Sequence, residues 1–299
     1  MRNWIKKKLR NQIEAFLRTE LQAMKNELLA ELKKEYRELR WQEFLQDKSI
    51  EKIIHPVNDK ISINLYKDNY LSPLIFSNQF EEDIISFITS NLQAGDCFVD
   101  IGANIGLFSL LASPVVSFDG LVLSFEPTGN TFNRFDENIK HNAINNIRAH
   151  QIALSDYEGA ASFNVSTDGH DAFNSFSLPQ YGSNYNQETV DVKLLDSFFD
   201  KLEPYKNRIL MKVDVEGWEY NVIKGAGKIL QELSPIMIIE FNDENTQNSP
   251  FKCTDVYSLI QSYGYELFSL INGTLIKKEN EEYFGYQNLI AKKAASNIK

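Results

Sequence analysis

The chain has 299 residues, 43% hydrophobic and 24% charged, a balance typical of globular proteins and a length that allows one large α/β domain with an appendage. No run of about 18 apolar residues is present, so no membrane-spanning helix is expected. The formal net charge is -10, and because residues 1–48 hold 12 Lys/Arg against 8 Asp/Glu, the remainder is acidic, with 19 against 33, which argues against a nucleic-acid partner.

Residues 1–50 are expected to form an amphipathic, coiled-coil-like helix. No proline or glycine occurs from Trp4 to Leu45, and apolar residues recur every three or four positions, namely Ile13, Leu17, Leu21, Met24, Leu28, Leu32, Tyr36 and Leu39. Such a helix would be about 60 Å long, more than the width of a small domain, so its stripe needs a partner. Self-association into a homo-oligomer is the leading interpretation, and folding back onto the rest of the chain is the alternative. The basic residues 1–10 add a third option, weak peripheral contact with a membrane.

Residues 55–285 are expected to form one α/β domain, followed by a polar C-terminal tail at 286–299. Strand-like segments alternate with helical ones; the strands are 61–66, 97–101, 121–125, 146–154, 209–215, 236–241 and a pair near 266–277, and the helices are 79–92, 130–142, 218–233 and 256–265. Strands that are apolar on both faces and separated by helices predict a mostly parallel sheet with helices on both faces, which is a Rossmann-like architecture.

Residues 157–195 interrupt this alternation with short polar and aromatic pieces, which predict a hairpin plus a loop. His170 lies there beside Asp168 and Asp171, but no second histidine is near enough to complete a metal site. Cys97 and Cys253 lie far apart without a metal-ligand pattern, and the basic start of the chain lacks the apolar segment of an export signal. The sequence therefore predicts no metal site and a cytoplasmic protein, with peripheral contact at the inner face of a membrane as the alternative.

The sharpest local motif is VDIGANIG, residues 99–106, in which a strand ending at Asp100 runs into a turn with Gly102 and Gly106. We expect Gly102 to let a ligand approach the backbone, and Gly106 to let the following helix pack against the strand. The spacing lacks the G-x-G-x-x-G fingerprint of nicotinamide enzymes. Glu126 ends the next strand, in SFEP, where an acidic side chain can accept hydrogen bonds from both ribose hydroxyls of an adenosine ligand.

Lys212, Asp214 and Glu216 lie two residues apart at the end of an interior strand. Alternation along a strand would put all three on one face, beside the crevice where parallel sheets bind ligands. A charged residue in an apolar strand is costly to bury unless it is paired, so an ion pair between Lys212 and a carboxylate is the purely structural alternative. Glu240 and Asn242 end the next strand and either line the same pocket or cap a neighbouring loop.

Together these motifs resemble the FkbM family of methyltransferases, in which a D-x-G-A-N-x-G turn, an F-E-P strand end, an asparagine in the following helix and a K-x-D-x-E-G strand occur in this order. Here they are VDIGANIG, SFEP, Asn138 and KVDVEG, and the resemblance covers about residues 60–280. It implies a class I methyltransferase fold that binds S-adenosylmethionine and methylates a hydroxyl group, often on a sugar or secondary metabolite. It also implies two groups of cofactor-binding residues. Glu126 would bind the ribose, and the methionine end would be bound by Asp100, Gly102, Ala103, Asn104 and Gly106.

A hydroxyl acceptor needs a base, because an alcohol is weakly acidic. Asp214 or Glu216 is the expected base, with Lys212 tuning that carboxylate or orienting the acceptor. Aromatic residues of the 157–195 insertion either stack on sugar faces or fill a core; they are Phe163, Phe173, Phe176, Tyr181 and Tyr185. Two other functions remain as alternatives: a Rossmann-type oxidoreductase, and a non-catalytic assembly protein whose domain only binds a ligand.

Overall fold

The computed structural model describes residues 2–167, 174–176 and 184–293, with the backbone alone for residues 2–15. Part of the predicted loop is therefore left aside: His170 with Asp168 and Asp171, and the aromatic residues Phe173 and Tyr181, lie outside the described residues.

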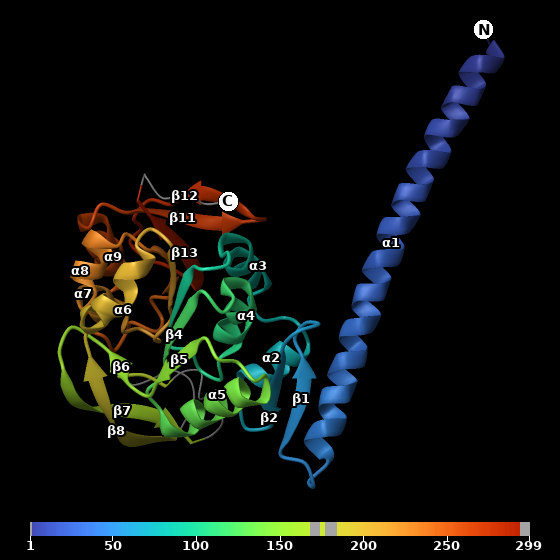
Figure 1. Ribbon diagram of the computed structural model, residues 1–299. Helices are drawn as coiled ribbons and strands as arrows, with labels where there is room; N and C mark the ends of the chain where they lie inside the picture. Colours follow the sequence, from blue (N-terminus) through green and yellow to red (C-terminus); the bar gives the residue numbers. More distant parts are fainter. Residues whose placement is uncertain (1, 168–173, 177–183, 294–299) are drawn as a thin grey trace.

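One large sheet runs through the body of the molecule (Figure 1). Its eight strands are β3 (Cys97–Ile101), β4 (Leu121–Phe125), β5 (Ile147–His150), β9 (Ile209–Val213), β10 (Ile236–Phe241), β11 (Glu266–Ile271), β12 (Thr274–Lys277) and β13 (Gln287–Lys292). The strand order is β12-β11-β13-β10-β9-β3-β4-β5, parallel from β10 to β5 and antiparallel in the other three. All five residues of β3 and of β9 are buried, as expected for strands covered on both faces. The predicted Rossmann-like, mostly parallel sheet is confirmed.

Helices cover both faces of this sheet. Over one face lie α2 (Leu71–Phe76), α3 (Glu82–Asn91), α4 (Leu107–Val116) and α5 (Gly129–His141). Over the other lie α6 (Phe199–Leu202), α7 (Glu219–Lys224), α8 (Gly227–Glu232) and α9 (Cys253–Ser262), with the short 3-10 helices η2 (Leu195–Phe198) and η3 (Glu203–Tyr205). Alternate residues of β3 divide between the two cores, since Phe98 packs in the first and Val99 in the second.

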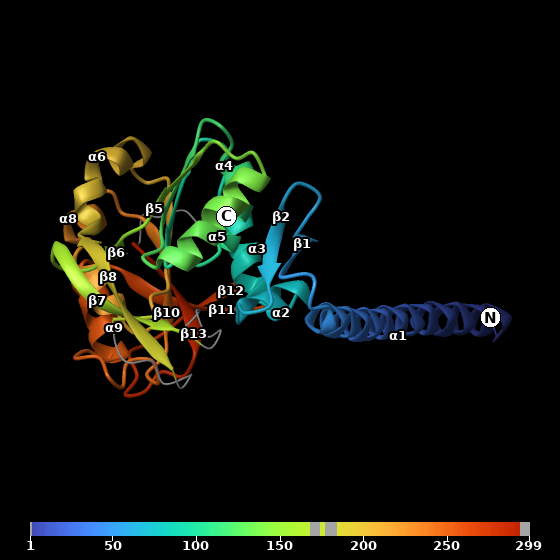
Figure 2. The same ribbon diagram turned by 90° about the horizontal axis from the view of Figure 1, so that it is seen from below.

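The N-terminal helix α1 (Arg2–Gln46) extends away from the body, as Figures 1 and 2 show. Among the described side chains of α1, those of its last turns join the core: Trp41 and Phe44 are buried, in the same cluster as α2 and α3. The hairpin of β1 (Lys52–Pro56) and β2 (Ser62–Tyr66) follows it. Among the described residues, none of the helices combines the length and apolar character that a membrane span requires.

A small three-stranded sheet accounts for the predicted insertion. Its strands are β6 (Ala153–Leu154), β7 (Gly159–Ser166) and β8 (Tyr185–Lys193), in the order β6-β8-β7, and β7 with β8 forms the expected hairpin. The aromatic rings of Phe163 and Phe176 lie 4.8 Å apart, and Phe176 lies 5.0 Å from Trp218. Buried Phe163 therefore fills a core beneath this hairpin.

Three predicted segments differ from the structure in kind or in continuity. The tail expected from residue 286 is not a tail at its start, because Gln287–Lys292 forms β13 between β10 and β11. The single strand expected at 146–154 is divided into β5 and β6, which belong to different sheets. The helix expected at 218–233 is divided near Gly225, where an added Cβ would lie 2.0 Å from the carbonyl oxygen of Ser155, so the chain passes too close to allow a side chain.

Candidate active site

The strand order places a crevice at the carboxyl ends of β3 and β9. The chain runs outward from β3 through β4 to β5 and then returns to β9 on the opposite side of β3, and such a switch point is where open α/β sheets bind ligands. A cavity of about 840 Å³ opens there. Its lining includes the ends of three strands: Gly102, Ala103 and Asn104 after β3, Lys212, Asp214 and Glu216 at β9, and Glu240 and Asn242 at β10.

A second, smaller cavity adjoins the first at the end of β4. Glu126 lines it, and Gly102, Asn104, Asp214 and Glu216 line both cavities. Most of its other walls are apolar, from Phe125, Ile152, Leu154, Phe176 and Trp218. The glycine turn and two of the predicted catalytic carboxylates therefore lie at the junction between the two spaces.

The protein backbone itself requires a glycine at position 102. It has a φ of +84°, and a Cβ there would lie 1.8 Å from the carbonyl oxygen of Asp214. The glycine lets the ends of β3 and β9 come together. Gly106 has a φ of +90°, and its Cβ would lie 2.1 Å from the ring of Phe135. The sequence predicted that Gly106 lets the following helix, α4, pack against β3. That role was wrong, because the close neighbour of Gly106 is Phe135 of α5.

Asp100 is buried beneath the turn. Its Oδ2 accepts a hydrogen bond from Ser109 Oγ at 2.5 Å, while its buried Oδ1 has no hydrogen-bond partner within the described part of the chain. Burial raises the pKa of Asp100 to about 6, against the opposing charge of Lys212. Asp100 and Gly106 are not among the described residues that line the two cavities, whereas Gly102, Ala103 and Asn104 are.

Glu126 is already held by the backbone around it. Its Oε2 accepts a hydrogen bond from the Asn104 N–H at 3.1 Å, and its Oε1 accepts from the N–H and the hydroxyl of Thr128 at 3.1 and 2.7 Å. Asn104, which donates this N–H, has a left-handed φ of 49°. The acid after β4 thus helps to shape the turn after β3.

Asn138, the asparagine of the third motif, is completely buried in α5. Its Oδ1 accepts hydrogen bonds from Asn64 N and Asn64 Nδ2, both at 2.8 Å, and its Nδ2 donates to the Ile105 carbonyl oxygen at 2.9 Å. One side chain therefore ties β2 and α5 to the loop that carries Asn104. Its role is structural, since it satisfies buried polar groups that would otherwise be unpaired.

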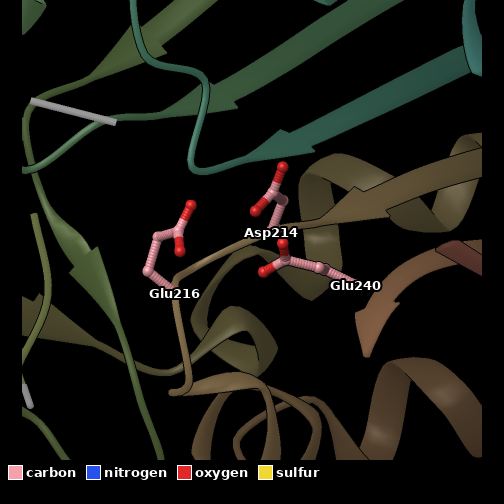
Figure 3. A group of neighbouring side chains, drawn as sticks. All are labelled: Asp214, Glu216 and Glu240. Carbon is pink, nitrogen blue, oxygen red and sulfur yellow. The ribbon is translucent and has the colours of Figure 1, made fainter. Parts of the chain in front are cut away.

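Three carboxyl groups converge at the ends of β9 and β10 (Figure 3). Asp214, Glu216 and Glu240 each bring an oxygen within 4.8 Å of the others. Burial, followed by the negative charges of its neighbours, raises the pKa of Glu216 well above its usual value, and the same causes raise the pKa of Glu240. Asn245 Nδ2 donates to Glu216 Oε2 at 2.6 Å. The sequence predicted no metal site, and it offered a place for Glu240 in the same pocket as one of two alternatives, which the structure confirms.

Lys212 is buried and forms an ion pair with Asp214, the pairing that the sequence offered as a structural alternative. Burial opposes its charged form, but the surrounding carboxylates, with Asp214 the largest, outweigh that effect and raise the pKa of Lys212. The expected strand alternation was wrong beyond this residue. β9 ends at Val213, and Glu216 has a left-handed φ of 53°, so a turn rather than a pleat directs Glu216 toward the cavity.

Glu81 and Tyr286 are two of the cavity residues that the sequence did not indicate. Glu81 precedes α3 with a left-handed φ of 43°, and its Oε1 accepts a hydrogen bond from the Tyr286 hydroxyl at 2.6 Å. Tyr286 was assigned to the tail, and Glu81 lies in an acidic first turn that looks like ordinary helix capping. Three non-glycine residues in left-handed conformation, Glu81, Asn104 and Glu216, line one cavity, and such strained backbone is common at functional sites.

Glu219 gives the site a dependence of stability on pH. Its Oε1 accepts from the backbone N–H groups of Val215 and Gly217, yet burial raises its pKa from 4.5 to about 7. Between these two pH values Glu219 holds a proton in the folded chain that it has lost in the unfolded chain, so its contribution to the free energy of unfolding falls as pH rises through this window and is level above it. We expect Glu219→Gln to remove up to about 3 kcal/mol of this fall.

Urea denaturation of wild type, Glu219→Gln and the exposed control Glu232→Gln, each at pH 5 and pH 8, checks this expectation. The difference between wild type and Glu219→Gln should grow toward pH 8, and Glu232→Gln should follow wild type. An equal pH dependence in all three chains would contradict a raised pKa at Glu219.

The profile described as "Methyltransferase FkbM domain" matches residues 100–267, more than half of the chain and all of the strand ends above. The chain belongs to the FkbM methyltransferase family. Family membership sets aside the oxidoreductase alternative, and the methyl donor of this FkbM protein is S-adenosylmethionine.

Two curated relatives are methyltransferases by name. The FkbM protein is 29% identical over 217 residues to "Methyltransferase 1" of Beauveria bassiana, covering 64% of this chain and 85% of the relative. It is 27% identical over 160 residues to "Hexuronic acid methyltransferase AglP" of Haloferax volcanii, covering 53% of this chain and 61% of the relative. Among solved structures, the methyltransferase FkbM of Methylobacillus flagellatus has 15% identity and a TM-score of 0.42, over 76% of this chain and 56% of that one.

Proposed function

We propose that this S-adenosylmethionine-dependent methyltransferase methylates a hydroxyl group of a glycan or of a sugar-bearing metabolite. The observation that carries the proposal is the cavity of about 840 Å³, in which carboxyl and amide side chains adjoin the glycine turn. Such groups form hydrogen bonds with the hydroxyls of a sugar, and Tyr70, Phe80 and Tyr286 add aromatic walls. The hexuronic acid methyltransferase among the relatives gives this acceptor class further support.

The residues present fit the cofactor. The smaller cavity has apolar walls suited to an adenine ring and the carboxylate of Glu126 as an acceptor for ribose hydroxyls. We therefore assign the ribose to Glu126 and the methionine end to the turn of Gly102, Ala103 and Asn104, with Asp100 and Gly106 supporting that turn from beneath.

Glu216 is our choice as the base. When bound, S-adenosylmethionine supplies an activated methyl group, and what the protein must add is alignment of the acceptor oxygen and removal of its proton. Glu216 lines both cavities, and its raised pKa brings it nearer to the operating pH, where a general base is most effective. Asp214 is held in an ion pair by Lys212, so we assign these two residues to orienting the acceptor.

The charge of the cavity limits the acceptor further. Five carboxyl groups line it, from Glu81, Asp214, Glu216, Glu240 and Glu244, and Lys212 is the one Lys or Arg among the described lining residues. A negatively charged acceptor that entered this cavity would be repelled by the carboxyl groups that are ionised. We therefore propose a neutral or cationic hydroxyl acceptor, in contrast to the acidic sugar that the name of the Haloferax volcanii relative specifies.

A matched pair of acceptors tests this proposal. Methyl glucoside and methyl glucuronide differ at one carbon, and we expect the neutral sugar to have a kcat/KM at least about tenfold higher, because like charges in a cleft cost more than about 1.4 kcal/mol. Formation of S-adenosylhomocysteine is the readout. Preference for the glucuronide would overturn the charge argument, and turnover on amines or thiols with none on any sugar hydroxyl would overturn O-methylation.

A further inference from the structure

The exposed part of α1 carries an apolar stripe that the catalytic body leaves uncovered. Six side chains form it, each at least half exposed: Leu17, Leu21, Met24, Leu28, Leu32 and Leu39. At 100° per residue these six fall within a sector about 80° wide and form a seam, while the exposed Phe16, Leu29 and Tyr36 lie outside it. An exposed apolar seam of this length on a soluble body indicates a protein interface.

The same helix docks on the body by its opposite face. The rings of Trp41 and Phe76 lie 5.4 Å apart, Phe44 is buried, and Arg37 Nη1 donates to the Ser77 carbonyl oxygen at 3.1 Å. The docking residues of α1 are centred about 170° around the helix from the stripe. Folding the stripe back onto the same chain would therefore break these contacts, so its partner must be another molecule. Figures 1 and 2 agree, because α1 leaves the body in both views.

The charges beside the stripe identify that partner. Between residues 16 and 40, four of the five charged residues along one flank are acidic, Lys34 being the exception, and those along the other flank are all basic. The acidic flank holds Glu20, Glu27, Glu31 and Glu38, and the basic flank holds Arg18, Lys25, Lys33 and Arg40, all exposed. When two copies of a helix pair in parallel, each flank of one helix faces the opposite flank of the other; when they pair antiparallel, like flanks meet. This chain therefore complements a second parallel copy of itself.

We propose that α1 forms a parallel coil with α1 of a second copy, with the two catalytic bodies at the same end and on opposite sides of the coil. Docking residues and stripe lie on opposite faces of the helix, so the bodies stay clear of the seam. Glu35 interrupts the stripe and is expected to weaken its C-terminal part. The pairing does not depend on the identity of the methyl acceptor.

Two single substitutions of similar chemistry test the seam. Leu28→Asp places a charge in the stripe, whereas Asn26→Asp places the same charge about 160° away on the other side of the helix. Light scattering of the full chain should give twice the 34.4 kDa chain mass for wild type and for Asn26→Asp, and the monomer mass for Leu28→Asp. S-adenosylmethionine binding by Leu28→Asp shows that the variant is folded. A monomeric wild type, or equal effects of the two variants, would overturn the proposal.

Orientation is tested by a disulfide and by charge reversal. Both native cysteines are buried, so Leu17→Cys adds one accessible thiol near the start of the exposed stripe. In a parallel pair the two added thiols meet and oxidise to a cross-linked dimer; in an antiparallel pair they stay apart. Reversing all four acids of one flank to Lys should give monomers, as should reversing the four bases to Glu, and mixing the two variants should restore a dimer. Absence of the disulfide, or a wild-type monomer that sediments with anionic vesicles, would refute the parallel pair.

Discussion

Replacing Glu216 with glutamine is expected to lower kcat by a factor of about 100 to 10,000, the range associated with loss of a general base. Glutamine keeps the shape of the side chain and an oxygen that accepts the hydrogen bond from Asn245, but it cannot take up the acceptor proton. S-adenosylmethionine binding, measured by calorimetric titration, should therefore remain within about threefold of wild type, because the lost interaction belongs to the transition state.

The pH profile separates a proton acceptor from a residue that merely shapes the site. Burial and negative neighbours raise the pKa of Glu216, so at low pH it is protonated and cannot act as a base. Wild-type kcat should rise with pH until that raised pKa is passed and then level off, while the residual kcat of Glu216→Gln should lose this rise.

Glu240→Gln and Asp214→Asn complete the comparison. Glu240 belongs to the same cluster, and we expect its substitution to lower kcat by less than about tenfold, since no proton transfer is assigned to it. Asp214→Asn leaves buried Lys212 without its ion-pair partner and should lower both stability and activity. If Asp214→Asn abolishes turnover while Glu216→Gln keeps more than about a tenth of it, the base is Asp214.

Local sequence patterns predicted most of the strands and helices. Most of the elements that they missed depend on contacts between residues distant in the sequence. The strands around Asp100 and Lys212 were predicted because buried parallel strands are continuous apolar runs. The tail that became β13 holds the apolar residues Leu289, Ile290 and Ala291, a short run that only its neighbours β10 and β11 convert into a central strand. Its loss from the prediction also removed Tyr286 from the expected site.

The sequence predicted which residues belong to the site better than it predicted how they are arranged. Gly102, Asp214 and Glu216 do line one cavity, but the sequence did not predict the backbone geometry that places them there. Gly102 makes room for the backbone of Asp214, a residue more than a hundred positions away in the chain. Glu216 reaches the cavity through a left-handed turn, and no side-chain pattern in a single sequence identifies a non-glycine residue with positive φ.

Replacing Glu126 with alanine is expected to weaken S-adenosylmethionine binding by at least about 100-fold, because two hydrogen bonds from ribose hydroxyls to a charged group are each worth about 1.5 to 3 kcal/mol. S-adenosylhomocysteine should lose the same factor, since the ribose is common to both ligands. Calorimetric titration of each ligand gives the two affinities. Equal losses would locate the effect at the nucleoside rather than at the methyl group or its positive charge.

The existing contacts of Glu126 make a structural control necessary. Thr128→Val removes the hydroxyl that donates to Oε1 at 2.7 Å, but keeps the backbone N–H groups of Thr128 and Asn104 on the carboxylate. We expect this variant to bind the cofactor within about fivefold of wild type, because one neutral donor contributes about 1 kcal/mol. Two results would each mean that Glu126 acts by holding the Asn104 turn. In the first, Thr128→Val weakens cofactor binding as much as Glu126→Ala does; in the second, the two ligand-free variants are destabilised to the same extent. Retained ligand-free stability with lost binding in Glu126→Ala alone would make the carboxylate itself the ribose contact.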